Sequence, residues 1–132
     1  MAKFDISGKT EQAWFDVEGG GRVEFRLLSS DELKEITNAC IKKSVEYPKL
    51  EGQFRRFETV ETDWDLWHEM VWDRSIVGWE GLYDVNEREI PVTKENKCLL
   101  MTRVQAFAEL HEKSMAALKT AIEERAEASE KN

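Results

Sequence analysis

The sequence predicts an α+β fold in a single domain. Two early stretches, 11–18 and 22–28, alternate apolar and polar residues with the period of a strand, and three glycines separate them. Later stretches repeat apolar residues at helical spacing, the longest over 103–126. Strands followed by helices are typical of the α+β class. We expect an N-terminal β-hairpin, two helices, a second short hairpin, a short helix and a long C-terminal helix.

Composition and charge limit the classes of function. The chain has 132 residues, of which 41% are hydrophobic and five are tryptophan, which is enough for one packed core. We expect residues 1–132 to form one domain, with residues 124–132 frayed at its end. The formal net charge of −8 repels phosphate groups, so nucleic acid is not an expected partner.

The sequence predicts neither export nor membrane insertion. Residues 1–10 contain no apolar run of signal-peptide length, and no other stretch approaches the length of a membrane span. Cys40 and Cys98 lie far apart and lack a disulfide spacing, which favours two reduced thiols. We expect a cytoplasmic protein with no membrane partner.

The N-terminal hairpin is predicted to have one dry face. Every second residue of each strand is apolar, and the glycines at 19–21 supply the turn. The apolar positions are Ala13, Phe15, Val17, Val23, Phe25 and Leu27. A phosphate-binding interpretation of the glycines is disfavoured, because such a loop opens a helix and here a strand follows.

A first helix is expected from Ser29 to about Val45. Ser29 and Glu32 have the spacing of a capping box at its start. Apolar residues then recur at helical spacing, at Leu33, Ile36, Cys40 and Ile41. Tyr47 and Pro48 are expected to end the helix. Residues 48–60 show no clear period, and we assign no element to them.

A second helix is expected after Thr62, a residue type that suits an N-cap. Its apolar residues cover a wide arc, so we expect this helix to be central. They are Val60, Trp64, Leu66, Trp67, Met70, Val71 and Val77. His68 and Glu69 begin like a zinc-protease motif, but Trp72 stands at the position of the second histidine, so no metal site is predicted.

The stretch 76–90 is predicted to form the second hairpin. Its alternating face holds Val77, Trp79, Gly81 and Tyr83, and residues 84–89 supply a polar turn. Trp79 and Tyr83 are the expected anchors of this arm.

A capped helix is expected to follow the second hairpin. Pro91 lacks an amide donor and suits an edge position, and Thr93 is the expected N-cap of a helix that begins at Lys94 or Glu95. This short helical segment is expected to run to about Met101.

The long helix carries a heptad-like apolar seam. Its seam residues include Val104, Phe107, His111, Met115, Leu118 and Ile122. A helix over 103–126 is roughly 36 Å long at 1.5 Å per residue, longer than so small a body covers. We therefore expect part of the seam to bind a partner. The alternative is an amphipathic helix that packs on its own domain.

The segment 76–97, IVGWEGLYDVNEREIPVTKENK, resembles the small tail-assembly chaperones of long-tailed bacteriophages and prophages. The resemblance covers about twenty residues and includes Gly78, Trp79, Glu80, Gly81, Pro91, Thr93 and Asn96. It departs from the family where Glu87, and not glycine, follows Asn86. A tight turn is less favourable without glycine, so we expect a longer or shifted loop.

The resemblance implies a non-enzymatic chaperone in the cytoplasm of a bacterial host. Such a protein would bind helical segments of the tape-measure protein, hand them to the tail-tube protein, and need no cofactor or metal. The seam would supply the binding surface, and a helix seam also suits a homo-oligomer.

Other functions remain open at the level of sequence. No phosphate loop or metal-ligand cluster is present, and the two histidines lie on different predicted helices, so we expect no enzyme and no catalytic residue. The first alternative is a structural virion or prophage adaptor protein that acts through protein contacts. The second, weaker one is an acidic inhibitor that occupies a basic site on a host protein.

Overall fold

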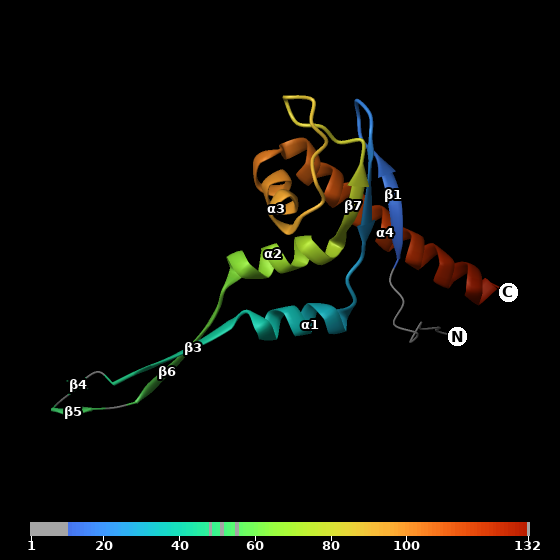
Figure 1. The fold of residues 1–132 in the computed structure, drawn as a ribbon. Helices are drawn as coiled ribbons and strands as arrows, with labels where there is room; N and C mark the ends of the chain where they lie inside the picture. The colour runs from blue at the N-terminus through green and yellow to red at the C-terminus, as the bar shows by residue number, and fades with distance from the viewer. Residues whose placement is uncertain (1–10, 48, 51, 55, 132) are drawn as a thin grey trace.

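A computed structural model describes residues 11–47, 49–50, 52–54 and 56–131 (Figure 1). The expectations for residues 1–10, for Pro48 and for Asn132 fall outside the described residues. The elements are β1 (Gln12–Asp16), β2 (Arg22–Arg26), α1 (Ser30–Ala39), β3 (Ile41–Glu46), β4 (Lys49–Leu50), β5 (Gln53–Phe54), β6 (Phe57–Thr62), α2 (Trp64–Ser75), β7 (Ile76–Glu80), α3 (Lys94–Arg103) and α4 (Gln105–Lys131). The predicted α+β class is confirmed.

The body is built on a three-stranded antiparallel sheet in the order β1-β2-β7. Its first two strands are the predicted N-terminal hairpin, in which Phe15 pairs with Val23 and Ala13 with Phe25. All three turn glycines, 19–21, have positive φ, the conformation that glycine adopts without steric cost. The third strand, β7, is far away in sequence and completes the dry face.

A bulge between β2 and β7 changes which residues of β7 face inward. Glu24 pairs with Gly78 and Phe25 with Ile76, so Val77 is an extra residue between them. Ile76 and Trp79 are both buried as a result, and Val77 is exposed. The predicted common face of Val77 and Trp79 is wrong, because strict alternation holds only in a regular ladder.

The chain leaves β7 through a loop that a side chain organises. The Asp84 carboxylate accepts hydrogen bonds from the backbone amides of Asn86 (2.8 Å) and Arg88 (3.1 Å). Glu87 takes a left-handed φ of 60°, a conformation that glycine adopts more easily. Tyr83 and Glu89 form an isolated bridge, and the backbone amides of Asp84 and Ile90 donate to the carbonyls of Arg88 and Leu82 across the loop, but no second strand forms, so the predicted hairpin over 76–90 is reduced to β7 and this loop. Tyr83 is 61% exposed, so the predicted anchoring role of this residue is wrong.

Helix α1 begins as predicted and ends earlier than predicted. The Ser29 hydroxyl accepts a hydrogen bond from the Glu32 amide (3.2 Å), and the Glu32 carboxylate pairs with Arg26 of β2 (2.7 Å). The helix stops at Ala39, and the predicted extension to Val45 is wrong. The residues from Ile41 onward are a strand instead, because they pair with a distant segment that local periodicity cannot identify.

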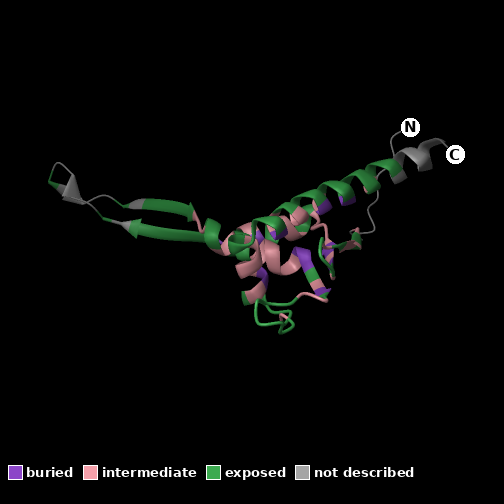
Figure 2. Cartoon of the chain, turned by 90° about the horizontal axis from the view of Figure 1, so that it is seen from above, coloured by how far each residue is buried: buried purple, intermediate pink, exposed green. Residues whose placement is uncertain are grey.

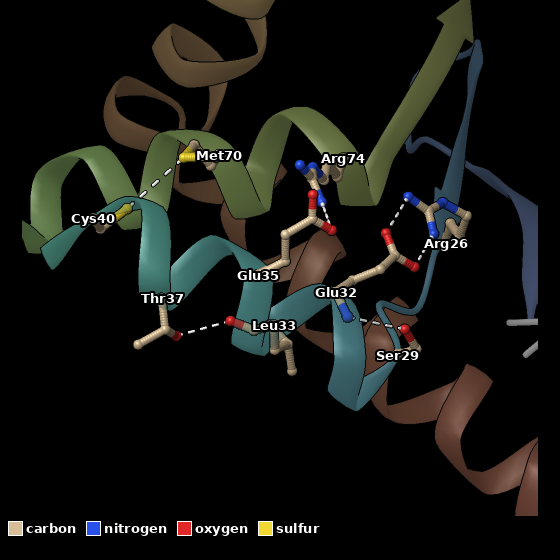
Figure 3. Close-up of polar contacts among 9 residues, drawn as sticks. All are labelled: Arg26, Ser29, Glu32, Leu33, Glu35, Thr37, Cys40, Met70 and Arg74. Atoms are coloured by element: carbon tan, nitrogen blue, oxygen red, sulfur yellow. Dashed lines mark hydrogen bonds and ion pairs between the residues drawn. The ribbon is translucent and has the colours of Figure 1, made fainter.

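Helix α2 lies against α1 and leads into β7 (Figures 1 and 3). Its N-cap is Asp63, one residue after the predicted Thr62, and the Asp63 carboxylate accepts from the Leu66 amide. Figure 3 shows two contacts that join these helices, Arg74 to Glu35 (3.6 Å) and the Cys40 thiol to the Met70 sulfur (3.7 Å). Cys40 is buried, as a small apolar residue would be.

The two C-terminal helices close the body. Thr93 caps α3 as predicted, with its hydroxyl accepting from the Asn96 amide (3.1 Å). Lys97, which is buried, ties α3 to α2 through the carbonyl and the carboxylate of Asp73, at 2.9 and 3.1 Å. Helix α3 ends at its C-cap, Val104, and the chain continues directly into α4, which crosses the sheet (Figure 1). The core consists of Val23, Phe25, Ile76, Trp79, Phe107 and Leu118.

Candidate protein-interaction surface

The middle of the predicted seam on α4 packs on the chain's own sheet. Phe107 and Leu118 are only 6% and 4% exposed and belong to the core, and Met115 packs against that core. The Phe107 ring lies 6.1 Å from that of Phe25 and 6.3 Å from that of Trp79. The alternative interpretation of the seam, an amphipathic helix on its own domain, therefore describes this part.

The ends of the seam are placed differently from its middle. Val104 is 42% exposed and lies at the break between α3 and α4, outside both helices. Ile122 is half-buried on α4. These two residues are about five turns of helix apart along the chain. The structure therefore does not gather the six predicted seam residues into one open surface.

His111 is a polar group at the edge of the core. Its Nε2 lies 3.0 Å from the hydroxyl of Ser75, and its ring makes an edge contact with Phe25 at 5.3 Å between centroids. Burial lowers the pKa of His111 below its ordinary value of 6.5, because the apolar surroundings disfavour the charged ring. The site therefore favours the neutral imidazole over the charged one.

The stability of the fold should therefore fall as the pH falls from 7.5 to 5.5. Because the pKa of His111 is lower in the folded chain than in the unfolded chain, the unfolded chain binds more protons below about pH 6.5. Urea unfolding followed by tryptophan fluorescence at several pH values measures this loss. His111→Gln should reduce the slope of unfolding free energy against pH. His68→Gln, the same change at an exposed histidine, should leave that slope unchanged. An unchanged slope in His111→Gln would contradict the assignment.

Three exposed apolar side chains lie on a two-stranded ribbon formed by β3 and β6. The ribbon projects away from the body in both views, with the short strands β4 and β5 at its far end (Figures 1 and 2). The sequence predicts no element over residues 48–60, which make up much of this region. Three polar residues separate Ile41 from Val45, so this stretch lacks the alternation of a strand, and the helical stripe through Ile36 and Cys40 favours a helix instead.

The ribbon is amphipathic. Its antiparallel pairs are Ile41 with Thr62, Lys43 with Val60 and Val45 with Glu58 on one face, and Lys42 with Glu61, Ser44 with Thr59 and Glu46 with Phe57 on the other. We call the first set the apolar ribbon face. Ile41, Val45 and Val60 on this face are 38%, 41% and 57% exposed. On the second face, the first two pairs are polar, and the third pairs Glu46 with the apolar residue Phe57.

An aromatic row begins where the ribbon meets the body. Trp64, the first residue of α2, is exposed and makes an edge contact with Trp67 at 5.6 Å. The Trp67 indole donates to the Thr37 hydroxyl (3.1 Å), which fixes the row against α1. His68 continues the row with ring contacts to Trp67 at 5.2 Å and to Trp72 at 5.5 Å. The predicted central helix thus has one exposed tryptophan beside the ribbon.

The residues that carry the family resemblance serve as scaffold. The buried Trp79 donates its indole N–H to the carbonyl of Ile90 (2.7 Å), and the Asn96 side chain donates to the carbonyl of Pro91 (2.9 Å). Glu80 pairs with Arg22 across the sheet. Gly81 has a φ of 72° and packs so closely on Gly21 that a Cβ on Gly21 would lie 2.5 Å from the Gly81 carbonyl oxygen. The motif therefore holds the segment after β7 against the sheet.

The remaining chemical groups of the described residues form no metal centre. No group of three His, Cys, Asp or Glu side chains suited to a metal ion occurs in the described ranges. A surface hollow of about 600 Å³ lies between α2 and α3, beside Cys98 and Leu99. Burial raises the pKa of Cys98, which favours the thiol over the thiolate. None of the helices in the described part of the chain combines the length and the apolar character of a membrane span.

Comparisons with protein-family models, with curated proteins and with solved structures found no match for this chain.

Proposed function

We propose that this chain is a non-enzymatic tail-assembly chaperone of a long-tailed phage or prophage. It acts in the cytoplasm of the bacterial host, binds helical segments of the tape-measure protein and passes them to the tail-tube protein. The resemblance of residues 76–97 supports the family. The observation that carries a binding role is the apolar ribbon face, which presents Ile41, Val45 and Val60 to solvent.

The apolar ribbon face replaces the seam as the proposed client surface. A chaperone for a helical client needs an open apolar strip that matches the apolar stripe of an amphipathic helix. On the ribbon, Lys43 and Glu58 flank the valines and keep this face soluble when no client is bound. Helix α4 offers no comparable strip between Phe107 and Leu118, because that face is already in the core.

Replacement of both ribbon valines tests this function. Val45→Gln combined with Val60→Gln should abolish co-purification with the co-expressed tape-measure protein. Loss of two valines from an apolar contact costs about 3 kcal/mol, which corresponds to about a hundredfold in affinity. The fold should be retained, since both side chains are exposed. Circular dichroism and urea unfolding check that retention.

The matched control makes the same change at two exposed valines outside the ribbon, Val77 and Val85. Val77→Gln with Val85→Gln should leave co-purification unchanged. If the ribbon variant still captures the client as well as the wild type does, the client surface is elsewhere. If the wild-type chain captures no tape-measure protein, the chaperone function itself is refuted.

The alternative is a structural virion or prophage adaptor that also acts through the ribbon. The two functions differ in stoichiometry. A chaperone is absent from purified phage particles, whereas a structural component is present in a fixed number of copies. Quantitative mass spectrometry of particles separates them.

A further inference from the structure

Both long edges of the ribbon have unpaired backbone groups. In the described residues, β3 and β6 form a sheet of two strands, so each strand has a neighbour on one side only. The Asp63 amide donates to the Cys40 carbonyl (2.8 Å), which fixes the alternation of the ladder. By that alternation, Ile41, Lys43 and Val45 of β3 direct their amides and carbonyls outward, as do Glu58 and Val60 of β6. These are the groups to which another strand hydrogen-bonds.

The two edges carry opposite charge. Strand β3 carries Lys42, Lys43 and Glu46, and β6 carries Glu58 and Glu61, so β3 is net positive and β6 is net negative. Pairing of β3 with a second β3 would join two net positive strands, and pairing of β6 with a second β6 would join two net negative strands. Pairing of β3 with the β6 of another copy joins unlike charges. The ribbon is thus complementary to itself from edge to edge.

We propose that copies of this chain associate through their ribbons, with β6 of one copy antiparallel to β3 of the next. In this pairing, residues with outward-facing backbone groups lie opposite each other, and unlike charges meet. The register that satisfies both conditions sets Lys43 of one copy against Glu58 of its neighbour. The same register sets Ile41 against Val60. All four side chains belong to the apolar ribbon face, so this face runs on without interruption from copy to copy.

The association offsets a weakness of the single chain. A two-stranded ribbon in water is marginally stable, and three or more strands with an apolar face are needed for independent stability. The contact is heterologous, since a different edge is used on each side, and it leads to a ring or an open chain of copies. Adjacent strands in a sheet are rotated by about 20–25°, so each added two-stranded ribbon is rotated by about 40–50° relative to the one before it. This rotation separates the bodies of neighbouring copies, which lie at the ends of their ribbons.

Charge reversal tests the contact in the full-length chain. Sedimentation velocity over a concentration series should show assemblies larger than a monomer for the wild type. Lys43→Glu alone and Glu58→Lys alone should each weaken assembly about tenfold, because attraction becomes repulsion. These positions face Val60 and Val45 within their own ribbon, so reversal leaves the Lys42–Asp63 ion pair at the base of the ribbon intact. An equimolar mixture of the two variants, and the double variant, should both assemble again.

The controls are Lys113→Glu and Glu112→Lys, reversals at exposed positions of α4, which should change nothing. A wild-type chain that stays monomeric throughout the series overturns the proposal. So does restoration in neither the mixture nor the double variant, which would indicate a contact other than β3 with β6. The proposal goes beyond the chaperone function and needs no tape-measure protein, so either can fail while the other holds.

Discussion

Leu118→Glu should unfold the body, although Leu118 belongs to a helix face that looks from the sequence like a partner surface. Leu118 is 4% exposed and sits with Phe107 and Trp79 in the core. The change removes a buried leucine and places a carboxylate without a partner in apolar surroundings. The cost is about 4 kcal/mol or more, a large part of the roughly 5–15 kcal/mol that stabilises a typical domain.

Far-UV circular dichroism and urea unfolding measure this effect. Ala117→Glu provides the matched control, because Ala117 is the preceding residue on the same helix and is exposed. The control should stay within about 0.5 kcal/mol of the wild type. A folded Leu118→Glu variant of ordinary stability would show that α4 leaves the sheet at little cost. In that case the seam, and not the ribbon, would be the better candidate for client binding.

Phe25→Ala should lower the free energy of unfolding by about 3–5 kcal/mol. Phe25 is fully buried, and its ring lies 5.9 Å from Phe15, 6.1 Å from Phe107 and 5.3 Å from His111. It therefore joins both strands of the hairpin to α4. Truncation leaves a cavity that three elements border, and none of them can close it without losing other contacts.

Urea unfolding of Phe25→Ala and Phe25→Leu gives a graded comparison. The leucine variant keeps most of the side-chain volume and should lose clearly less stability than the alanine variant. Trp14→Ala, on the exposed face of the same hairpin, should cost less than Phe25→Ala, although tryptophan is the larger residue. Equal losses of unfolding free energy in Trp14→Ala and Phe25→Ala would contradict this expectation. They would mean that the hairpin face that carries Trp14 is buried as well.

The ribbon links the two proposals. Its apolar face is the proposed client surface, and its charged edges are the proposed contact between copies. If copies pair with Ile41 against Val60, the client surface lengthens with each added copy, which suits a long helical client better than a single ribbon does. The charge-reversal variants therefore also predict weaker capture of the tape-measure protein, in proportion to their loss of assembly.

The predicted functional surface was placed on α4 for a reason that the structure makes clear. A heptad-like pattern states that one face of a helix is apolar, but it does not state what covers that face. Here Phe107 and Leu118 meet Val23, Phe25 and Trp79 of the sheet. The ribbon offered a weaker pattern, since Ile41, Val45 and Val60 are spread over two segments that pair only across a gap in sequence.

By itself, the sequence determined the features that depend on neighbouring residues. The glycine turn at 19–21, the alternation of both hairpin strands and the caps at Ser29 and Thr93 each follow from contacts within a few residues. The α+β class was predictable because these local signals agree with one another.

Only the tertiary structure decided the features that depend on distant partners. Residues 41–46 are a strand because residues 57–62 pair with them, and Val77 turns outward because a bulge against Glu24 and Phe25 shifts the register. The same holds for α4, whose apolar face is core and not an interface because β2 and β7 meet beneath it. Local pattern fixes which side of an element is apolar, and only packing fixes what that side touches.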